Sequence, residues 1–157
     1  MISATHLHAM IIHFPIALLI AGFLSEVIAL ISKKEFFRNV AFYLLVLGAM
    51  GAGAAYLSGD YAGEGIEDGP LEGPMELHEQ AATITLWLSV ATALFGAFMF
   101  YFKSKVALTK LVSIILFAAT IGSVAWTGYL GGQLVYKHGA GVELSLPGLN
   151  STVEEED

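Results

Sequence analysis

Histidine is the residue type in this chain whose pattern points most directly to chemistry. The segment "LHAMIIHFPIALLI", residues 7–20, carries His8 and His13 into the start of a long apolar run, and His78 and His138 lie at the ends of two further apolar runs. Neutral imidazole nitrogens are ligands of haem iron, zinc and copper. Because an imidazole gains nothing from a hydrocarbon environment, histidines at these places predict a site for a metal ion or a metal-containing cofactor.

The rest of the chain consists mainly of segments that could position these histidines in a membrane. Hydrophobic residues make up 56% and charged residues 13% of the 157 residues, and the mean hydropathy is +0.71, which is typical of an integral membrane protein. The predicted spans, each near the ~20 residues that cross a bilayer, are residues 8–32, 38–58, 75–102 and 106–136. Since backbone groups in lipid must pair within their own segment, we expect an all-α, polytopic membrane protein: one antiparallel four-helix transmembrane bundle formed by residues 1–157.

The distribution of charge predicts how this bundle is oriented. Six of the seven basic residues lie in or beside the short loops after the first and third spans: Lys33, Lys34, Arg38, Lys103, Lys105 and Lys110. The positive-inside rule places these loops in the cytoplasm, so both termini, an acidic outer loop (59–74) and an acidic tail (145–157) lie outside. We expect a multi-pass protein of a bacterial inner membrane with both termini in the periplasm. Its net charge of −7 excludes nucleic acid as a partner and leaves the lipid bilayer.

The basic residues also serve as a depth marker for the histidines. His8 and His78 each lie 25 residues before a lysine of a short loop, which puts both ~37 Å above the cytoplasmic end. His13 comes out at ~30 Å, and His138 stands somewhat higher if its helix continues past the two glycines before it. We therefore expect these four side chains to gather at the outer end of the bundle. His8 and His13 are ~140° apart around one helix, so they should make different contacts.

Small residues form stripes on the predicted helices next to the histidines. Such stripes include Ala82, Thr85 and Ser89 after His78, and Ser123 and Thr127 before Gly131. Small side chains let membrane helices approach closely, and Gly128 with Gly132 forms a small-xxx-small pair of that kind. A flat ligand between helices would need the same small side chains, so the stripes are compatible with close packing and with a cofactor.

Glu26 is the one acidic residue well inside a predicted span. A carboxylate at such a depth is a candidate for proton transfer. Because Glu26 lies only seven residues before Lys33, we favour an interfacial ion pair with Lys33, Arg38 or Lys110.

Four stretches of the sequence resemble a known family: "HAMIIHFPIALL", "LSGDYAG", "LHEQAA" and "GYLGGQLVYKHGAGV". They are similar to the bacterial four-span membrane proteins grouped as domain of unknown function 2231, and the resemblance covers nearly the whole chain. One departure is Ala9, where the family often has proline. The resemblance implies a bundle with histidines at its outer face. Some relatives are fused to c-type cytochrome modules, which implies electron transfer and a c-type cytochrome or a larger respiratory-type membrane complex as partner.

The chain contains no cysteine, so any haem is held without covalent attachment, as haem b. We expect a membrane-embedded haem-binding electron-transfer protein or subunit, holding one haem or two through axial ligands drawn from His8, His13, His78 and His138. Trp126 and Tyr129 would pack at the edge of the macrocycle. Lys137, the one basic residue on the outer side, would bind a propionate.

Two alternatives to haem remain open. The same four histidines, helped by Asp60 or Glu79, could hold a Zn or Cu ion. The chain could instead be a structural subunit of a larger membrane complex, with its histidines hydrogen-bonded to neighbouring backbone and carboxylates. No nucleophile with an adjacent base is recognisable, so the sequence leaves open whether the protein catalyses a reaction.

Overall fold

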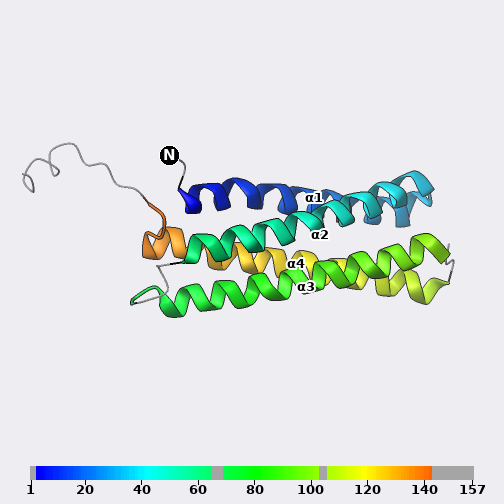
Figure 1. Cartoon of the computed structure of the whole chain (residues 1–157). Coiled ribbons are helices and arrows are strands. Elements are labelled where there is room, and N and C mark those ends of the chain that lie inside the picture. The colour runs from blue at the N-terminus through cyan, green and yellow to red at the C-terminus, as the bar shows by residue number, and fades with distance from the viewer. Residues whose placement is uncertain (1–2, 65–68, 103–105, 143–157) are drawn as a thin grey trace, which may run out of the picture.

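The protein is a bundle of four long helices. The computed structural model describes residues 3–64, 69–102 and 106–142. The helices are α1 (Ala4–Ser32), α2 (Glu35–Gly63), α3 (Glu72–Phe102) and α4 (Ala107–His138), and the described residues contain no strand. Each is long and apolar enough to cross a membrane. Figure 1 shows them running lengthwise beside one another, which confirms the predicted all-α, four-span fold.

The helices extend beyond five of the predicted span limits: the starts of α1, α2 and α3 and the ends of α2 and α4. The helix α1 begins at Ala4 rather than residue 8, because the Ser3 side chain accepts a hydrogen bond from the His6 backbone N–H at 3.3 Å. At the other end of the chain, α4 continues past its paired glycines to His138. It stops there because Gly139 adopts a φ of 66° and donates its N–H to the carbonyls of Leu134 and Val135.

The loop between α2 and α3 is shorter than the sequence predicted. The helix α2 passes residue 58 and ends at Gly63, and α3 already begins at Glu72, so both ends of the predicted loop 59–74 are helical. A glycine in a helix costs only about 1 kcal/mol, whereas an unpaired backbone amide at the membrane costs more. The acidic tail 145–157, residues 65–68, and Lys103 and Lys105 lie outside the described residues.

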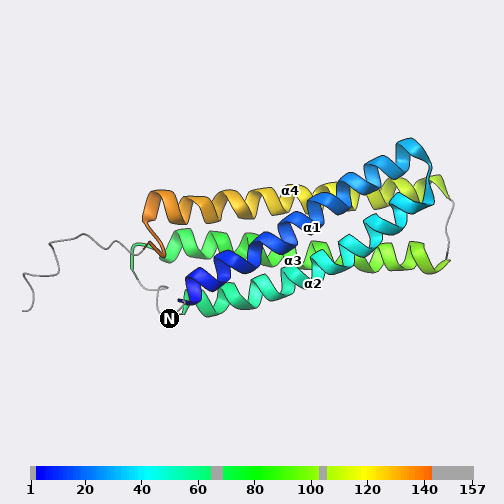
Figure 2. The same ribbon diagram turned by 90° about the horizontal axis from the view of Figure 1, so that it is seen from above.

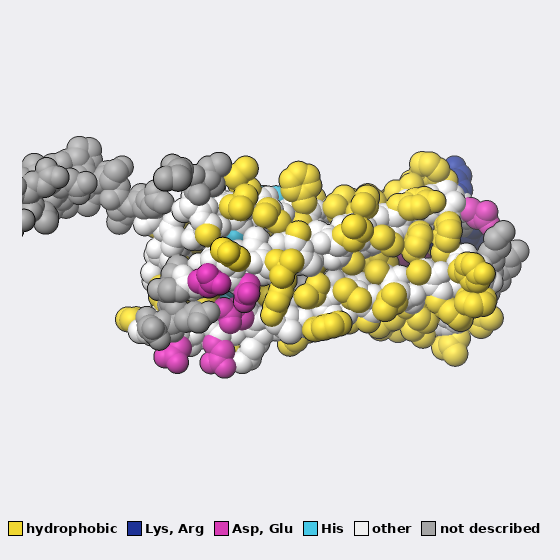
Figure 3. All heavy atoms as spheres, in the orientation of Figure 1, with side chains coloured by type: hydrophobic (Ala, Val, Ile, Leu, Met, Phe, Trp, Pro, Cys, Tyr) yellow, Lys and Arg dark blue, Asp and Glu magenta, His cyan; other side chains and the backbone are white. Residues whose placement is uncertain are grey.

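Each helix packs against two neighbours. The helix α1 contacts α2 and α4, α3 contacts α2 and α4, and the diagonal pairs make no contact within the described chain. Figure 2 shows that α1 crosses the bundle obliquely. The inner core is small: it is formed by Leu19, Leu45 and Phe117, and Phe23 stands edge-on to Phe117 with 5.7 Å between ring centroids. Most large apolar side chains face outward, as lipid-facing side chains do (Figure 3).

The two hairpins, α1–α2 and α3–α4, pack in different ways. In the first, Leu19 and Pro15 of α1 lie directly against Gly48 and Gly51 of α2. In the second, hydroxyl groups bond across the interface: Thr92 to Thr120 at 2.9 Å, and Thr85 to Ser123 at 2.6 Å and to Thr127 at 2.8 Å. The small-residue stripes therefore serve helix packing and interhelical hydrogen bonding.

The interpretation of Gly128 and Gly132 as a packing pair is wrong for contacts within this chain. A Cβ atom added at either position would meet no atom of the described residues within 4 Å. The α3–α4 contact instead uses the face of α4 that carries Thr120, Ser123 and Thr127. Two small residues four apart mark one face of a helix, but their spacing does not say which face meets the neighbour.

Charge is divided between the ends of the bundle. We call the end where α1 and α3 begin the histidine end, and the end where α1 turns into α2 the basic end. Most of the acidic side chains visible in Figure 3 gather at the histidine end, and the basic ones lie at the other. Among the described residues, Asp60, Glu64, Glu72 and Glu76 belong to the first end, and Lys33, Lys34, Arg38 and Lys110 to the second; Lys137 at the first end and Glu35 at the second depart from this division.

Candidate functional site

Two histidines on diagonal helices turn toward the interior at the histidine end. His8 lies in the second turn of α1 and His78 in the second turn of α3, and both are half-buried. Because α1 and α3 do not touch, the two side chains enter the bundle from separate hairpins.

The hydrogen bonds of His8 determine which of its ring nitrogens can bind a metal. Its Nδ1 lies 2.9 Å from the Ser58 Oγ, and that hydroxyl donates its own hydrogen to the Ala55 carbonyl at 2.9 Å. Since the Ser58 hydrogen is already used, the Ser58 oxygen accepts, and His8 donates from a protonated Nδ1. The lone pair of the neutral ring is therefore on Nε2, the nitrogen that metals bind in such an arrangement.

His78 reaches the same state through a different partner. Its Nδ1 lies 3.2 Å from the backbone carbonyl oxygen of Thr127. A carbonyl oxygen can only accept, so Nδ1 carries the hydrogen and Nε2 carries the lone pair. Metal-ligating histidines typically donate their second ring N–H to a carbonyl in this way, which fixes the orientation of the ring. The Thr127 hydroxyl is itself held by Thr85 at 2.8 Å.

Each imidazole packs on a glycine of the next helix. A Cβ atom added to Gly59 would lie 3.0 Å from Cε1 of His8, and one added to Gly131 would lie 3.0 Å from Cε1 of His78. The hydrogen-bonded residues are also similarly spaced in the sequence: His8 and Ser58 are 50 positions apart, and His78 and Thr127 are 49 positions apart. The two hairpins thus build the same half-site twice, each with one histidine, one hydrogen-bond acceptor and one glycine.

The other two predicted ligands do not join this pair. His13 is exposed, and its Nδ1 bonds within α1 to the Ala9 carbonyl at 2.6 Å. His138 is exposed on the last turn of α4. The difference between His8 and His13 agrees with their five-residue spacing, which turns them to different sides of one helix. The expected gathering of four histidines is therefore reduced to two.

The remaining candidates lie on the outside of the bundle. Trp126 and Tyr129 are 58% and 56% exposed and stack on each other, with 5.6 Å between ring centroids. Lys137 is exposed and donates to the side-chain oxygen of Gln133 at 3.0 Å. Each of these two contacts joins a pair of residues within α4, and neither involves the inward-facing histidines.

The carboxylates expected to help a metal ion are also placed outward. Asp60 and Glu79 are exposed. Across the described ranges, no three side chains among His, Asp and Glu come together in a way that could hold a metal ion. The described part of the protein thus offers a pair of imidazoles rather than a three- or four-ligand cage.

Comparison with known families places these features in one domain. The model of the family described as "Predicted membrane protein (DUF2231)" matches residues 4–144. The chain belongs to this family. The DUF2231 domain therefore includes both hairpins, both inward-facing histidines and the partners of their Nδ1 atoms. No curated protein and no solved structure matches the chain.

Sequence reasoning did not identify the residues that orient the two rings in this DUF2231 domain, namely Ser58, Gly59, Thr127 and Gly131; Thr127 and Gly131 were named only as part of a small-residue stripe. A signal for them exists in the repetition of short motifs. "LH" occurs at residues 7–8 and 77–78, and Tyr-Leu-x-Gly occurs as "YLSG" at 56–59 and as "YLGG" at 129–132. Each Tyr-Leu-x-Gly motif contains the glycine on which a histidine packs, Gly59 as its fourth residue and Gly131 as its third.

Proposed function

We propose that this protein is a membrane-embedded b-type haem protein that transfers electrons, with His8 and His78 as the two axial ligands. The observation that carries the proposal is the state of the two rings: both direct a hydrogen-bonded Nδ1 to a partner on a neighbouring helix and keep the lone pair on Nε2. Two neutral imidazoles from different helices are a suitable ligand set for a haem iron in a helix bundle.

The number of ligands favours haem over a free zinc or copper ion. A structural zinc site uses four protein ligands and a catalytic one three, and the described residues do not supply such a group. Haem brings four pyrrole nitrogens of its own, so two imidazoles complete its coordination. The absence of cysteine makes covalent attachment impossible, and the cofactor of this proposal is therefore haem b.

The proposal includes an orientation and a class of partner. The histidine end would face the periplasm of a bacterial inner membrane and the basic end the cytoplasm, because basic loops are retained in the cytoplasm. The electron partner would be a c-type cytochrome or a larger respiratory-type membrane complex. Asp60, Glu64 and Glu76 at the histidine end would favour approach of a partner with a basic surface.

The test is an absorption spectrum of the purified protein in detergent, oxidised and then reduced with dithionite. We expect a Soret band and sharp reduced α and β bands from one haem b. Replacing His8 or His78 with alanine should abolish this spectrum or change it to that of a five-coordinate haem. His13→Ala and His138→Ala are matched controls that should leave it unchanged.

Two results would overturn the proposal. One is a wild-type protein that remains colourless after incubation with haemin. The other is a correctly folded His8→Ala,His78→Ala double variant that retains the wild-type spectrum.

A further inference from the structure

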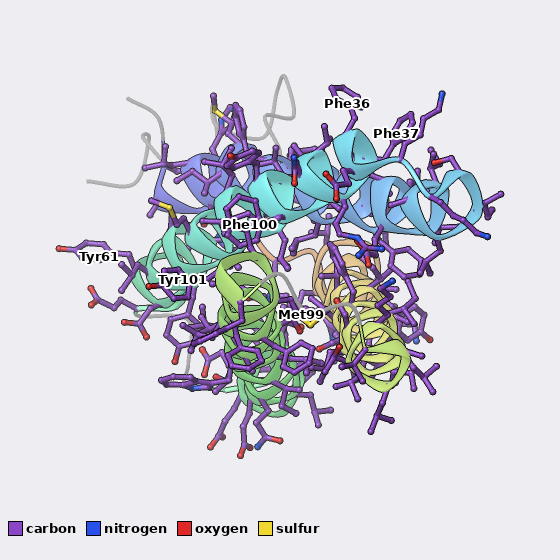
Figure 4. The ribbon with its side chains drawn as sticks, turned by 90° about the vertical axis from the view of Figure 1, so that its right-hand side faces the viewer. Phe36, Phe37, Tyr61, Met99, Phe100 and Tyr101 are labelled. Atoms are coloured by element: carbon purple, nitrogen blue, oxygen red, sulfur yellow. The ribbon has the colours of Figure 1, made fainter. Side chains whose placement is uncertain are left out.

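A second polar feature lies at the basic end, away from the histidines. A cavity of about 550 Å³ opens between all four helices, with Glu26, Arg38 and Lys110 in its polar wall and Phe42 and Phe117 in its apolar wall. Figure 4 views this end along the bundle: Met99, which also lines the cavity, projects into the space between the helices, whereas Phe36 and Phe37 point away from it.

Glu26 is the feature of this cavity that packing does not explain. The residue is 7% exposed, and in the described chain it makes no hydrogen bond and no ion pair. The ion pair expected with Lys33, Arg38 or Lys110 is therefore not formed; Arg38 acts on the carboxylate only from a distance. Every fully buried side-chain oxygen or nitrogen that the structure describes has a hydrogen-bond partner, so the unpartnered Glu26 oxygens must reach the cavity.

Cations surround the mouth of the same cavity. A smaller cavity of about 330 Å³ shares Glu35, Arg38 and Lys110 with the first and adds Lys33 and Lys34. Lys33 adopts a φ of 57° at the end of α1, a conformation that glycine would adopt more easily. Four basic residues thus outnumber one carboxylate, Glu35, around the smaller cavity, while the larger one presents the buried Glu26.

The carboxylate lies deeper than the cations. Glu26 lies six residues before Ser32, the last residue of α1, or ~9 Å, whereas Arg38 and Lys110 are each three residues past the first residue of their helix, or ~4.5 Å. A ligand that satisfies both therefore has an anionic group nearer the mouth and a hydrogen-bond-donating cation a few ångströms further in. Phosphoethanolamine has this arrangement, with a phosphate and a primary ammonium joined by two carbons.

We propose that this cavity binds the headgroup of a phospholipid with a primary ammonium, the phosphate lying between Arg38 and Lys110 and the ammonium on Glu26. The acyl chains would leave past Leu30, which lines the smaller cavity and is 36% exposed. Basic pockets between transmembrane helices are known to bind lipid phosphates. A purely anionic lipid would satisfy the cations but leave Glu26 without a donor, and a trimethylated ammonium has no N–H to donate.

The test is native mass spectrometry of the full-length protein with phosphatidylethanolamine, phosphatidylglycerol and phosphatidylcholine of identical acyl chains. We expect the ethanolamine lipid to bind about tenfold more tightly than the other two, the value of one charge-assisted hydrogen bond. Glu26→Gln should remove this preference, and Arg38→Gln should weaken binding of all three lipids. Glu72→Gln changes an exposed carboxylate at the opposite end and serves as the control.

Free headgroup compounds distinguish a lipid site from a simple anion site. Phosphoethanolamine should displace the bound lipid at concentrations where inorganic phosphate does not. Equal displacement by phosphate, equal binding of the glycerol and ethanolamine lipids to the wild type, or an unchanged preference in Glu26→Gln would each overturn the proposal. The haem spectrum is not a readout here, so this proposal and the haem proposal can fail separately.

Discussion

At the scale of single residues, Gly59 and Gly131 set the positions of the two imidazoles. A methyl group at either position would lie 3.0 Å from the Cε1 atom of His8 or His78, so the ring would have to give way by a few tenths of an ångström, and we expect this to disturb its hydrogen bond to Ser58 or Thr127. An outer-shell partner of a metal ligand typically contributes at least tenfold to affinity.

We therefore predict that Gly59→Ala and Gly131→Ala each weaken haem binding about tenfold, because the displaced ring no longer holds Nε2 in place. Titration of the haem-free protein with haemin, followed at the Soret band, measures the effect. Gly128→Ala and Gly132→Ala are matched controls, since an added Cβ meets no atom within 4 Å at either position. Equal affinities for all four variants would contradict the assignment of the ligand pair.

The level of His8 and His78 was predictable from the sequence, but their selection among four histidines was not. Counting residues from the basic loops gives the position of a residue along its helix, and this count is the same for His8 and His78. Whether a side chain faces the bundle or the lipid depends on the rotation of its helix. That rotation follows from contacts such as Leu19 on Gly48, which join segments far apart in the sequence.

At the scale of the elements, the α1–α2 hairpin depends on one close approach. Leu19 is 1% exposed, and a Cβ atom added to Gly48 would lie 2.7 Å from its Cγ and Cδ2 atoms. Neither the side chain nor the helix backbone behind it has free space, because the α1 backbone nitrogen at Leu19 is also within 3.3 Å. The two helices must separate to admit a methyl group.

Gly48→Ala should accordingly destabilise the protein by about 1–3 kcal/mol, the usual range for overpacking. Gly53→Ala in the same helix is the control, because nothing lies within 4 Å of the added Cβ. That control should be neutral or slightly stabilising, since alanine favours the helix more than glycine does. Unfolding of the detergent-solubilised protein in increasing sodium dodecyl sulfate measures both, and equal midpoints would contradict the packing described for α1 and α2.

The existence of all four helices was predictable from apolar length, whereas their ends were not. Glycine and aspartate at residues 59–63 suggested a loop, yet these residues are helical. Near a membrane the alternative to a helical hydrogen bond is an unpaired backbone amide. The free-energy cost of that unpaired amide is larger than the cost of placing glycine in a helix. Gly139 does end α4, because it adopts the left-handed conformation that closes the helix.

At the scale of the whole molecule, the two ends of the bundle have opposite character. The histidine end carries exposed carboxylates, and the basic end carries lysines and an arginine around a cavity. From such an asymmetry the positive-inside rule predicts that the basic end faces the cytoplasm. The proposed electron partner depends on this orientation, since a periplasmic partner needs the histidines outside; the same orientation would place the proposed lipid site in the cytoplasmic leaflet.

The orientation can be measured directly, because the chain contains no cysteine and single cysteines can be introduced without background. Glu72 begins α3 at the histidine end and Ser32 ends α1 at the basic end, and both are exposed. In intact spheroplasts, a membrane-impermeant maleimide should label Glu72→Cys at once and Ser32→Cys only after lysis, because the retained basic loops keep Ser32 inside. Labelling after lysis of both variants controls for reactivity. The reverse pattern would turn the bundle over and place the imidazole pair on the cytoplasmic side, where a periplasmic cytochrome could not reach it.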